Sequence, residues 1–166
     1  MKKKTKKQAW IISGLAVVLV LVVVYALSSK TAEPVVDAQL RVAETNWNWG
    51  DIAMRDGIAS KEVEMTNDSS TPITITRMET SCMCTTVQIM HVDGSKSALR
   101  GMVGHGSNAT LSETIAAGET VKLKINFDPN AHGPNATGRM SRSIILQTNS
   151  QAQPEIRLTF VGNVIK

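Results

Sequence analysis

Two cysteines, Cys82 and Cys84, are the only thiols of this 166-residue chain, and a single residue separates them. If the segment is extended, both side chains leave the same face of the strand, because side chains alternate from face to face along a strand. A pair of this kind suits three interpretations: a soft-metal site, a redox-active disulfide, or two small buried apolar groups.

The methionines and histidines near the pair favour a soft metal. Four of the seven methionines after the initiator lie between positions 78 and 102, where both cysteines also lie. Thiolates and thioethers select Cu(I) over harder cations, although zinc would also accept two sulfurs and two nitrogens. Glycines at 101, 104 and 106 let the following loop bend toward the thiols. The predicted Cu(I) ligands are Cys82, Cys84, Met102 and His105, with His132 as an outlying candidate.

A disulfide between the two cysteines is the second interpretation. In an extended strand the Cα atoms of residues i and i+2 lie about 6.5 to 7 Å apart, near the upper limit for a bridge. Such a bond would be strained and easily reduced, which leaves a thiol redox role as an alternative. The familiar redox motif places two residues between its cysteines and begins a helix, and this chain shows neither feature there.

The third interpretation is plain packing, because free cysteines usually behave as small buried hydrophobes. Methionines also fill irregular gaps in cores. In this case His91 simply continues the buried face that Val87 and Ile89 begin at a period of two.

The chain shows none of the usual catalytic patterns. Its three histidines, at positions 91, 105 and 132, have no serine or cysteine in a recognisable nucleophile setting, and no glycine-rich phosphate loop follows a strand. We therefore predict that the protein is not an enzyme and that it binds a partner or acts as a scaffold. A purely structural or adhesive role with buried cysteines is the alternative.

The net charge of +4 does not indicate nucleic-acid binding. Six of the 18 Lys and Arg residues lie within the first 30 positions, which contain no acidic residue, so the rest of the chain carries 12 basic against 14 acidic side chains. A nearly neutral domain offers no basic surface to a phosphate backbone. Nucleic acid is therefore excluded as a partner.

Residues 10–27 contain no charged side chain and predict a transmembrane helix, because 18 residues at helical rise reach most of the way across a hydrocarbon core of about 30 Å. The lysine-rich tail at 1–9 orients this anchor with its N-terminus in the cytoplasm and the following domain outside. A cleaved signal peptide is the alternative, but the apolar run exceeds the usual length of about 7 to 15 residues. Residues 28–39 form a short linker.

From residue 40 the pattern changes to short alternating runs separated by turn residues, which is typical of an all-β sandwich. The clearest run is 121–127, where four apolar residues alternate with polar ones. Similar runs lie at 62–65, 73–76, 144–146 and 156–160. The count of about seven strands suits an antiparallel immunoglobulin-like sandwich.

Two further segments bear on the site. Trp47 and Trp49 would share one face of an early strand, and we expect at least one of them in the core. Residues 93–114 are rich in Gly, Ser and Asn and are predicted to form a rim loop. Binding residues on a rigid sandwich tend to lie in such loops.

A series of short segments adds a family resemblance. In chain order they are WNWGDI at 47–52, KEVEMTN at 61–67, TPITI at 71–75, SCMCT at 81–85, AGET at 117–120, FDP at 127–129, LQTNS at 146–150 and FVG at 160–162. Together they resemble the bacterial domain-of-unknown-function 1573 family (DUF1573) over residues 40–164. The resemblance implies an immunoglobulin-like fold on an extracytoplasmic protein, related to ASH and major-sperm-protein-like scaffolds, and no established activity. The family usually has glycine between its two cysteines, where this chain has Met83.

The sequence therefore predicts a single-pass cell-membrane protein with one domain outside the bilayer. Its parts are a basic cytoplasmic tail (1–9), a transmembrane helix (10–27), a linker (28–39) and an immunoglobulin-like domain (40–166). Its predicted partners are the membrane and a protein of the cell envelope.

Overall fold

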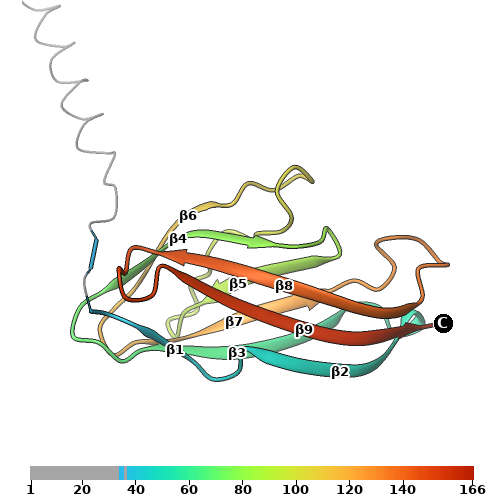
Figure 1. Cartoon of the computed structure of the whole chain (residues 1–166), viewed down its shortest axis with the longest axis horizontal. Helices are drawn as coiled ribbons and strands as arrows, with labels where there is room; N and C mark the ends of the chain where they lie inside the picture. The colour runs from blue at the N-terminus through green and yellow to red at the C-terminus, as the bar shows by residue number, and fades with distance from the viewer. Residues whose placement is uncertain (1–33, 36) are drawn as a thin grey trace, which may run out of the picture. The chain divides into compact units, whose positions relative to one another are not determined.

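Residues 34, 35 and 37–166 are described by a computed structural model of the chain (Figure 1). They belong to one unit, Glu33–Lys166. The predicted tail, the predicted transmembrane helix and most of the predicted linker lie outside the described residues. In the described part, no helix combines the length and the apolar character that crossing a bilayer requires.

Two β-sheets make up the described residues, together with one short 3₁₀ helix, η1 (Met54–Asp56). The four-stranded sheet has the order β1-β3-β7-β5, with β1 at Leu40–Val42, β3 at Ala59–Asn67, β7 at Thr120–Phe127 and β5 at Thr85–Met90. The five-stranded sheet has the order β2-β9-β8-β4-β6, with β2 at Asn46–Ala53, β9 at Glu155–Ile165, β8 at Gly138–Thr148, β4 at Ile73–Thr80 and β6 at Thr110–Ile115.

The alternating apolar residues of the strands hold the two sheets together. On β7, the four residues at 121, 123, 125 and 127 are at most 2% exposed, as the alternation predicts. Residues of β3 and β5, and of β4, β8 and β9 on the other sheet, join them in one core cluster. Each buried aliphatic side chain contributes about 1.5 to 3 kcal/mol relative to an exposed one. This burial is therefore the main stabilising contribution.

The all-β prediction is confirmed, but two details of the predicted sandwich are wrong. The described residues contain nine strands rather than about seven, and β2 runs parallel to β9. The additional strand β6 occupies the end of the predicted rim loop and pairs with β4, where Ile73 lies opposite Ile115. Alternation gave little sign of β6, because Ile115 is its one fully buried residue.

Four aromatic rings contact one another in the core. Phe160 stacks on Trp47 with ring centroids 5.1 Å apart and on Trp49 at 5.5 Å, and it meets Phe127 edge-on at 5.9 Å. Trp47 is buried and Trp49 is half-buried, which confirms the expectation of a core tryptophan. Such ring pairs contribute about 0.5 to 1.5 kcal/mol beyond the area they bury.

Replacing Phe160 with alanine tests this arrangement. We expect Phe160→Ala to lower the free energy of unfolding by about 3 to 5 kcal/mol, because the ring is fully buried and leaves a cavity among three aromatic neighbours. Urea denaturation followed by far-ultraviolet circular dichroism measures the change. The matched control is Val161→Ala on the same strand, where the side chain is 41% exposed and the expected change is within about 0.5 kcal/mol. Equal losses in the two variants would contradict the assigned core.

Candidate functional site

The two cysteines lie in the turn between β4 and β5, so the extended conformation considered for this segment is not the one it adopts. The Thr85 N–H donates to the Cys82 carbonyl at 3.1 Å, which closes a β-turn over Met83 and Cys84. This turn brings the Cα atoms of Cys82 and Cys84 to 5.3 Å, within the range that a disulfide spans. The two sulfurs are bonded to each other, and both side chains are buried.

The turn tolerates the loss of the family's glycine. Every non-glycine residue in the described part of the chain has a negative φ, so neither central position of the turn needs glycine's conformational freedom. The Met83 side chain instead projects outward and is 46% exposed. The bridge therefore lies beneath a methionine that solvent reaches.

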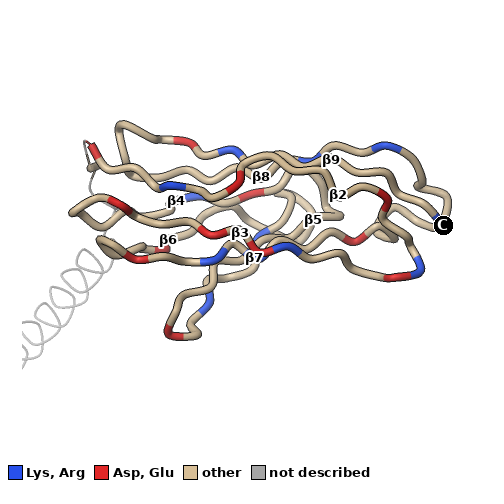
Figure 2. The backbone as a smooth tube through the Cα atoms, turned by 90° about the horizontal axis from the view of Figure 1, so that it is seen from below, with Lys and Arg blue, Asp and Glu red and all other residues tan. Residues whose placement is uncertain are grey.

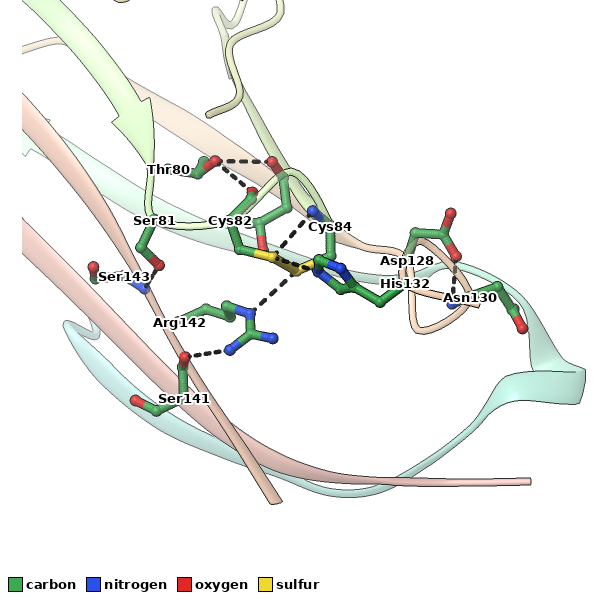
Figure 3. The surroundings of a disulfide bond; sticks show 11 residues. Thr80, Ser81, Cys82, Cys84, Asp128, Asn130, His132, Ser141, Arg142 and Ser143 are labelled. Carbon is green, nitrogen blue, oxygen red and sulfur yellow. Dashed lines mark hydrogen bonds between the residues drawn. A yellow bond between two sulfur atoms is a disulfide. The ribbon is translucent and has the colours of Figure 1, made fainter. Parts of the chain in front are cut away.

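Hydrogen bonds fix this turn to both sheets (Figure 3). Ser81 donates its N–H to the Ser143 carbonyl on β8, and the Ser143 N–H donates to the Ser81 hydroxyl, each at 2.9 Å. At the other end, the Asp128 N–H that follows β7 donates to the Cys84 carbonyl at 2.8 Å. Buried Thr80 donates from its hydroxyl to the Cys82 carbonyl at 2.9 Å. The backbone around the sulfurs is therefore anchored on every side.

Two side chains from other elements reach the sulfurs. His132, from the loop between β7 and β8, places its Nε2 3.0 Å from Cys82 Sγ. Arg142, on β8, donates from Nε to Cys84 Sγ at 3.1 Å and from Nη1 to the Ser141 carbonyl at 2.8 Å. Figure 3 shows both side chains directed at the disulfide. The site thus combines two sulfurs, an imidazole and a guanidinium.

Among the described residues, no carboxylate forms an ion pair with Arg142. Its side chain is half-buried and directed at Cys84 Sγ. Because Arg stays protonated in proteins, a permanent positive charge lies beside one sulfur of the pair.

Of the four predicted copper ligands, the structure brings the two cysteines together, and His132 completes their group. The ligand atoms of Cys82, Cys84 and His132 lie within 4.8 Å of one another. Met102 and His105 instead line, with Met83, a surface hollow of about 300 Å³ that the cysteines do not line. Copper binding through Met102 and His105 stays a prediction.

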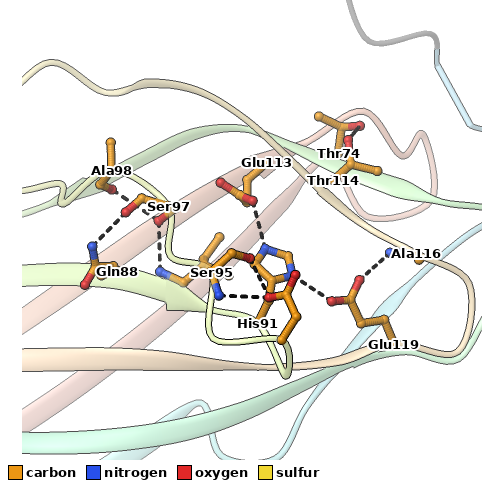
Figure 4. Close-up of polar contacts among 12 residues, drawn as sticks. Thr74, Gln88, His91, Ser95, Ser97, Ala98, Glu113, Thr114, Ala116 and Glu119 are labelled. Carbon is orange, nitrogen blue, oxygen red and sulfur yellow. Dashed lines mark hydrogen bonds and ion pairs between the residues drawn. The ribbon is translucent and has the colours of Figure 1, made fainter.

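His91 belongs to a different cluster. Figure 4 shows its ring between two carboxylates: Nδ1 lies 2.6 Å from Glu119 Oε1, and Nε2 lies 2.8 Å from Glu113 Oε1. Both nitrogens must donate to satisfy both carboxylates, which requires the protonated ring. Burial by itself would lower the pKa of His91, but the hydrogen bonds to Glu119 and Glu113 outweigh it and raise that pKa.

The pKa of Glu119 shifts in the opposite direction, downward. Its burial by itself would raise the pKa of the carboxyl group, but the hydrogen bonds from His91 and from the Ala116 N–H together lower it. The Ala116 N–H donates to Glu119 Oε2 at 2.7 Å. The His91 cluster therefore ties the end of β5 to β6 and to the turn before β7.

Charges of both signs are spread over the described strands and loops (Figure 2). Opposite charges face each other across strands, as Lys122 and Glu62 do at 3.0 Å. This mixture is what the nearly neutral composition after residue 30 predicts.

Comparison with solved structures gives the class of fold. A protein of unknown function from Porphyromonas gingivalis W83 is 14% identical with a TM-score of 0.54, over 82% of this chain and 50% of that one. The ASH / PapD-like domain 7 of human CEP192 is 12% identical with a TM-score of 0.47, over 83% of this chain and 95% of the domain. This chain thus spans half the length of the first. The first of these likenesses supports the two-sheet β-sandwich that the strand order shows.

The family follows from the sequence. The family described as "Protein of unknown function (DUF1573)" matches residues 40–93, from β1 through the cysteine turn to the loop after β5. The resemblance predicted from the short motifs is confirmed over this segment, where the chain matches the DUF1573 family. No curated protein matches the chain in a sequence search.

The sequence named His132 only as an outlying candidate and did not name Arg142. One signal for His132 was available, because its loop begins with Asp128-Pro129 directly after the strongest predicted strand. Arg142 had none, since a charged residue two positions before the apolar run of β8 is typical of a solvated strand face.

The His91 cluster predicts a defined pH dependence of stability. A raised pKa means that the contribution of His91 is complete below its unfolded value of about 6.5 and is lost as the pH rises through the folded value. Glu119 contributes above about 4.5 and loses its contribution as the pH falls through its lowered pKa. We therefore expect the cluster to stabilise the fold most between about pH 4.5 and 6.5.

In the unmodified chain, the free energy of unfolding should fall as the pH rises above this window. In the variant His91→Gln most of this fall should be absent. Urea denaturation at a series of pH values from 5 to 9 measures it. His105→Gln is the control, because His105 is an exposed histidine outside the cluster. A His91→Gln profile parallel to that of the unmodified chain would show that the cluster does not set the pH dependence.

Proposed function

We propose that this protein is a membrane-anchored, extracytoplasmic binding protein that takes up Cu(I) through reduced Cys82 and Cys84 with His132 as the third ligand. The observation that carries the proposal is the closeness of three donors, whose ligand atoms lie within 4.8 Å of one another. Bonds of about 2.0 to 2.3 Å from one ion to such sulfur and nitrogen atoms need only small side-chain movements. Reduction of the disulfide frees the two thiolates.

The charge around the donors favours a monovalent ion. Two thiolates and one Cu(I) leave one net negative charge, which the guanidinium of Arg142 offsets from 3.1 Å away from Cys84 Sγ. Zn(II) with the same ligands is already neutral, and a structural zinc site takes four protein ligands where this group has three. Thiolate ligands also select Cu(I) among soft metals.

The binding role is non-enzymatic in this proposal, and a protein of the cell envelope is the partner. Support comes from the apolar surface beside the bridge: Met83 and Leu99 are 46% and 52% exposed and line the same hollow as Met102 and His105. Exposed apolar side chains gathered at one place are typical of contact surfaces.

Titration of the reduced protein with Cu(I) against a chromogenic Cu(I) chelator, without oxygen, tests the metal. We expect one Cu(I) per chain, with binding lost in Cys82→Ser and in Cys84→Ser, because each removes one of the two thiolates that select the ion. We expect His132→Gln to weaken binding by at least about 10-fold to 100-fold, because a metal site already loses that much affinity when a group that only supports a ligand is removed.

The control variants separate the two ligand sets. His105→Gln and Met102→Leu should leave the affinity unchanged if His132 is the third ligand. Weaker binding in those two variants, together with unchanged binding in His132→Gln, would instead support Met102 and His105 as the ligands beside the cysteines. Absence of one-to-one binding in the reduced protein would end the copper proposal. Circular dichroism spectra of all variants check that the sandwich is intact.

The location rests on the apolar run at 10–27 and the lysines before it. Alkaline phosphatase is active only outside the cytoplasm, so its fusion after residue 166 should be active and should sediment with membranes. Deleting residues 10–27 should abolish both properties, whereas deleting residues 28–33 of the linker should not. An inactive fusion to the complete chain would place the domain in the cytosol and contradict the proposal.

A further inference from the structure

The bond between Cys82 and Cys84 has different surroundings at its two sulfurs. Cys84 Sγ accepts a hydrogen bond from the permanently charged Arg142 at 3.1 Å, and the Thr85 hydroxyl lies 3.7 Å from it. Cys82 Sγ accepts the neutral N–H of Cys84 at 3.3 Å and lies 3.0 Å from Nε2 of the exposed His132. Only one end of the bond therefore faces a fixed positive charge.

This difference matters because disulfide exchange moves negative charge onto one sulfur. An attacking thiolate bonds to one sulfur while the other departs with the electron pair of the broken bond. A donor that is already directed at the departing atom stabilises that charge without rearrangement. Charge-assisted hydrogen bonds are also about twice as strong as neutral ones. Arg142 therefore favours departure of Cys84 over departure of Cys82.

Both cysteines are buried, and the exposure of the residues around them differs. Cys84 is 3% exposed and Cys82 is 7% exposed, and the side chain beside Cys82 is the exposed His132 of a surface loop. Met83, at the top of the turn, is 46% exposed. An incoming sulfur therefore meets Cys82 from the side of a loop, whereas Cys84 is enclosed by β8 and its arginine.

We propose that the Cys82–Cys84 disulfide is a thiol-exchange centre in which Cys82 accepts the incoming sulfur and Cys84 leaves toward Arg142. A thiolate attacks Cys82 Sγ, a mixed disulfide forms there, and the Cys82–Cys84 bond breaks with its electron pair on Cys84. A second thiolate then attacks the sulfur of the first, which releases Cys82 as a thiolate. Two external thiols become one disulfide, and the protein gains two electrons. The same steps run in reverse when the reduced protein meets an oxidised partner.

This activity goes beyond copper binding and does not require it. The reaction takes place in the metal-free protein, and its product is the dithiol form in which we propose that the ion binds. A protein that exchanges thiols but takes up no Cu(I) would retain this inference and lose the proposed function. If the protein binds Cu(I) but does not exchange thiols, the proposed function is retained and this inference is lost.

The position of attack is tested by trapping. The oxidised, metal-free full chain is treated with glutathione, the reaction is stopped after short intervals by a large excess of N-ethylmaleimide, and the products are identified by peptide mass spectrometry. We expect glutathione on Cys82 and maleimide on Cys84, at least about tenfold above the opposite arrangement, because stabilisation of one leaving group by a charged donor has effects of this size. An equal distribution, or glutathione mainly on Cys84, would overturn the proposal.

The role of Arg142 is tested by rate. We expect Arg142→Met to slow reduction by glutathione about tenfold or more, and Arg142→Lys to restore part of the rate, because the positive charge stabilises the departing sulfur. Arg139→Met is the matched control on the same strand, since Arg139 is exposed and has no contact with either sulfur. Unchanged rates in Arg142→Met, in a variant with an unchanged circular dichroism spectrum, would overturn the inference.

The source of the attacking thiolate is distinguished by a second reductant. Reduced thioredoxin supplies a protein dithiol, and glutathione supplies a small-molecule thiol. Faster reduction by thioredoxin assigns the centre to protein partners, and faster reduction by glutathione assigns it to small thiols. Reduction by neither, at concentrations that open an exposed reference disulfide, would contradict the proposal.

Discussion

The packing of two sheets against each other determines where the cysteines lie. β4 belongs to the five-stranded sheet and β5 to the four-stranded sheet, so residues 81–84 must cross from one layer to the other. A crossing of four residues has to turn at once, and it buries its inward side chains at the end of the core. Cys82 and Cys84 are therefore part of the core cluster while their turn remains at the surface.

A second crossing brings the remaining groups to the same place. The chain also changes sheets between β7 and β8, and it does so beside the cysteine turn because Thr85 lies opposite Phe127 in the register of β5 and β7. Asp128 then bonds to Cys84 and His132 reaches Cys82. The strand register of the four-stranded sheet thus selects which loop supplies the imidazole. The pairing of β5 with β7 therefore brings His132 to the cysteines, although these residues are far apart in the sequence.

This dependence explains how much the sequence could predict. Alternation identified the inner residues of β3, β4, β7, β8 and β9, because one face of each strand is buried and the pattern is local. The loop after β5 does return to the turn, where the Thr80 N–H donates to the Gly101 carbonyl at 3.3 Å. It arrives on the side of Met83, so its methionine and histidine share a hollow with Met83. No local feature of the sequence indicates whether this loop meets the turn on the side of Met83 or on the side of the two sulfurs.

The choice of glycine or methionine at the centre of the turn follows from its backbone. With φ negative at Met83, the turn accepts any side chain there, and the residue is free to serve the surface instead of the fold. The Met83 side chain accordingly lines the surface hollow that Met102 and His105 share and that the cysteines do not line.

The metal binding and the sulfur exchange that we propose use the same atoms and therefore exclude each other at any one moment. The disulfide offers no thiolate to Cu(I), and bound Cu(I) leaves no thiolate free to attack. Arg142 favours the reduced form in both cases, because its charge lies 3.1 Å from the sulfur that becomes negative. In the oxidised state the same half-buried charge faces a neutral disulfide, and none of the ion pairs among the described residues includes it. The guanidinium therefore interacts more favourably with Cys84 once the proposed exchange or metal binding leaves negative charge on that sulfur.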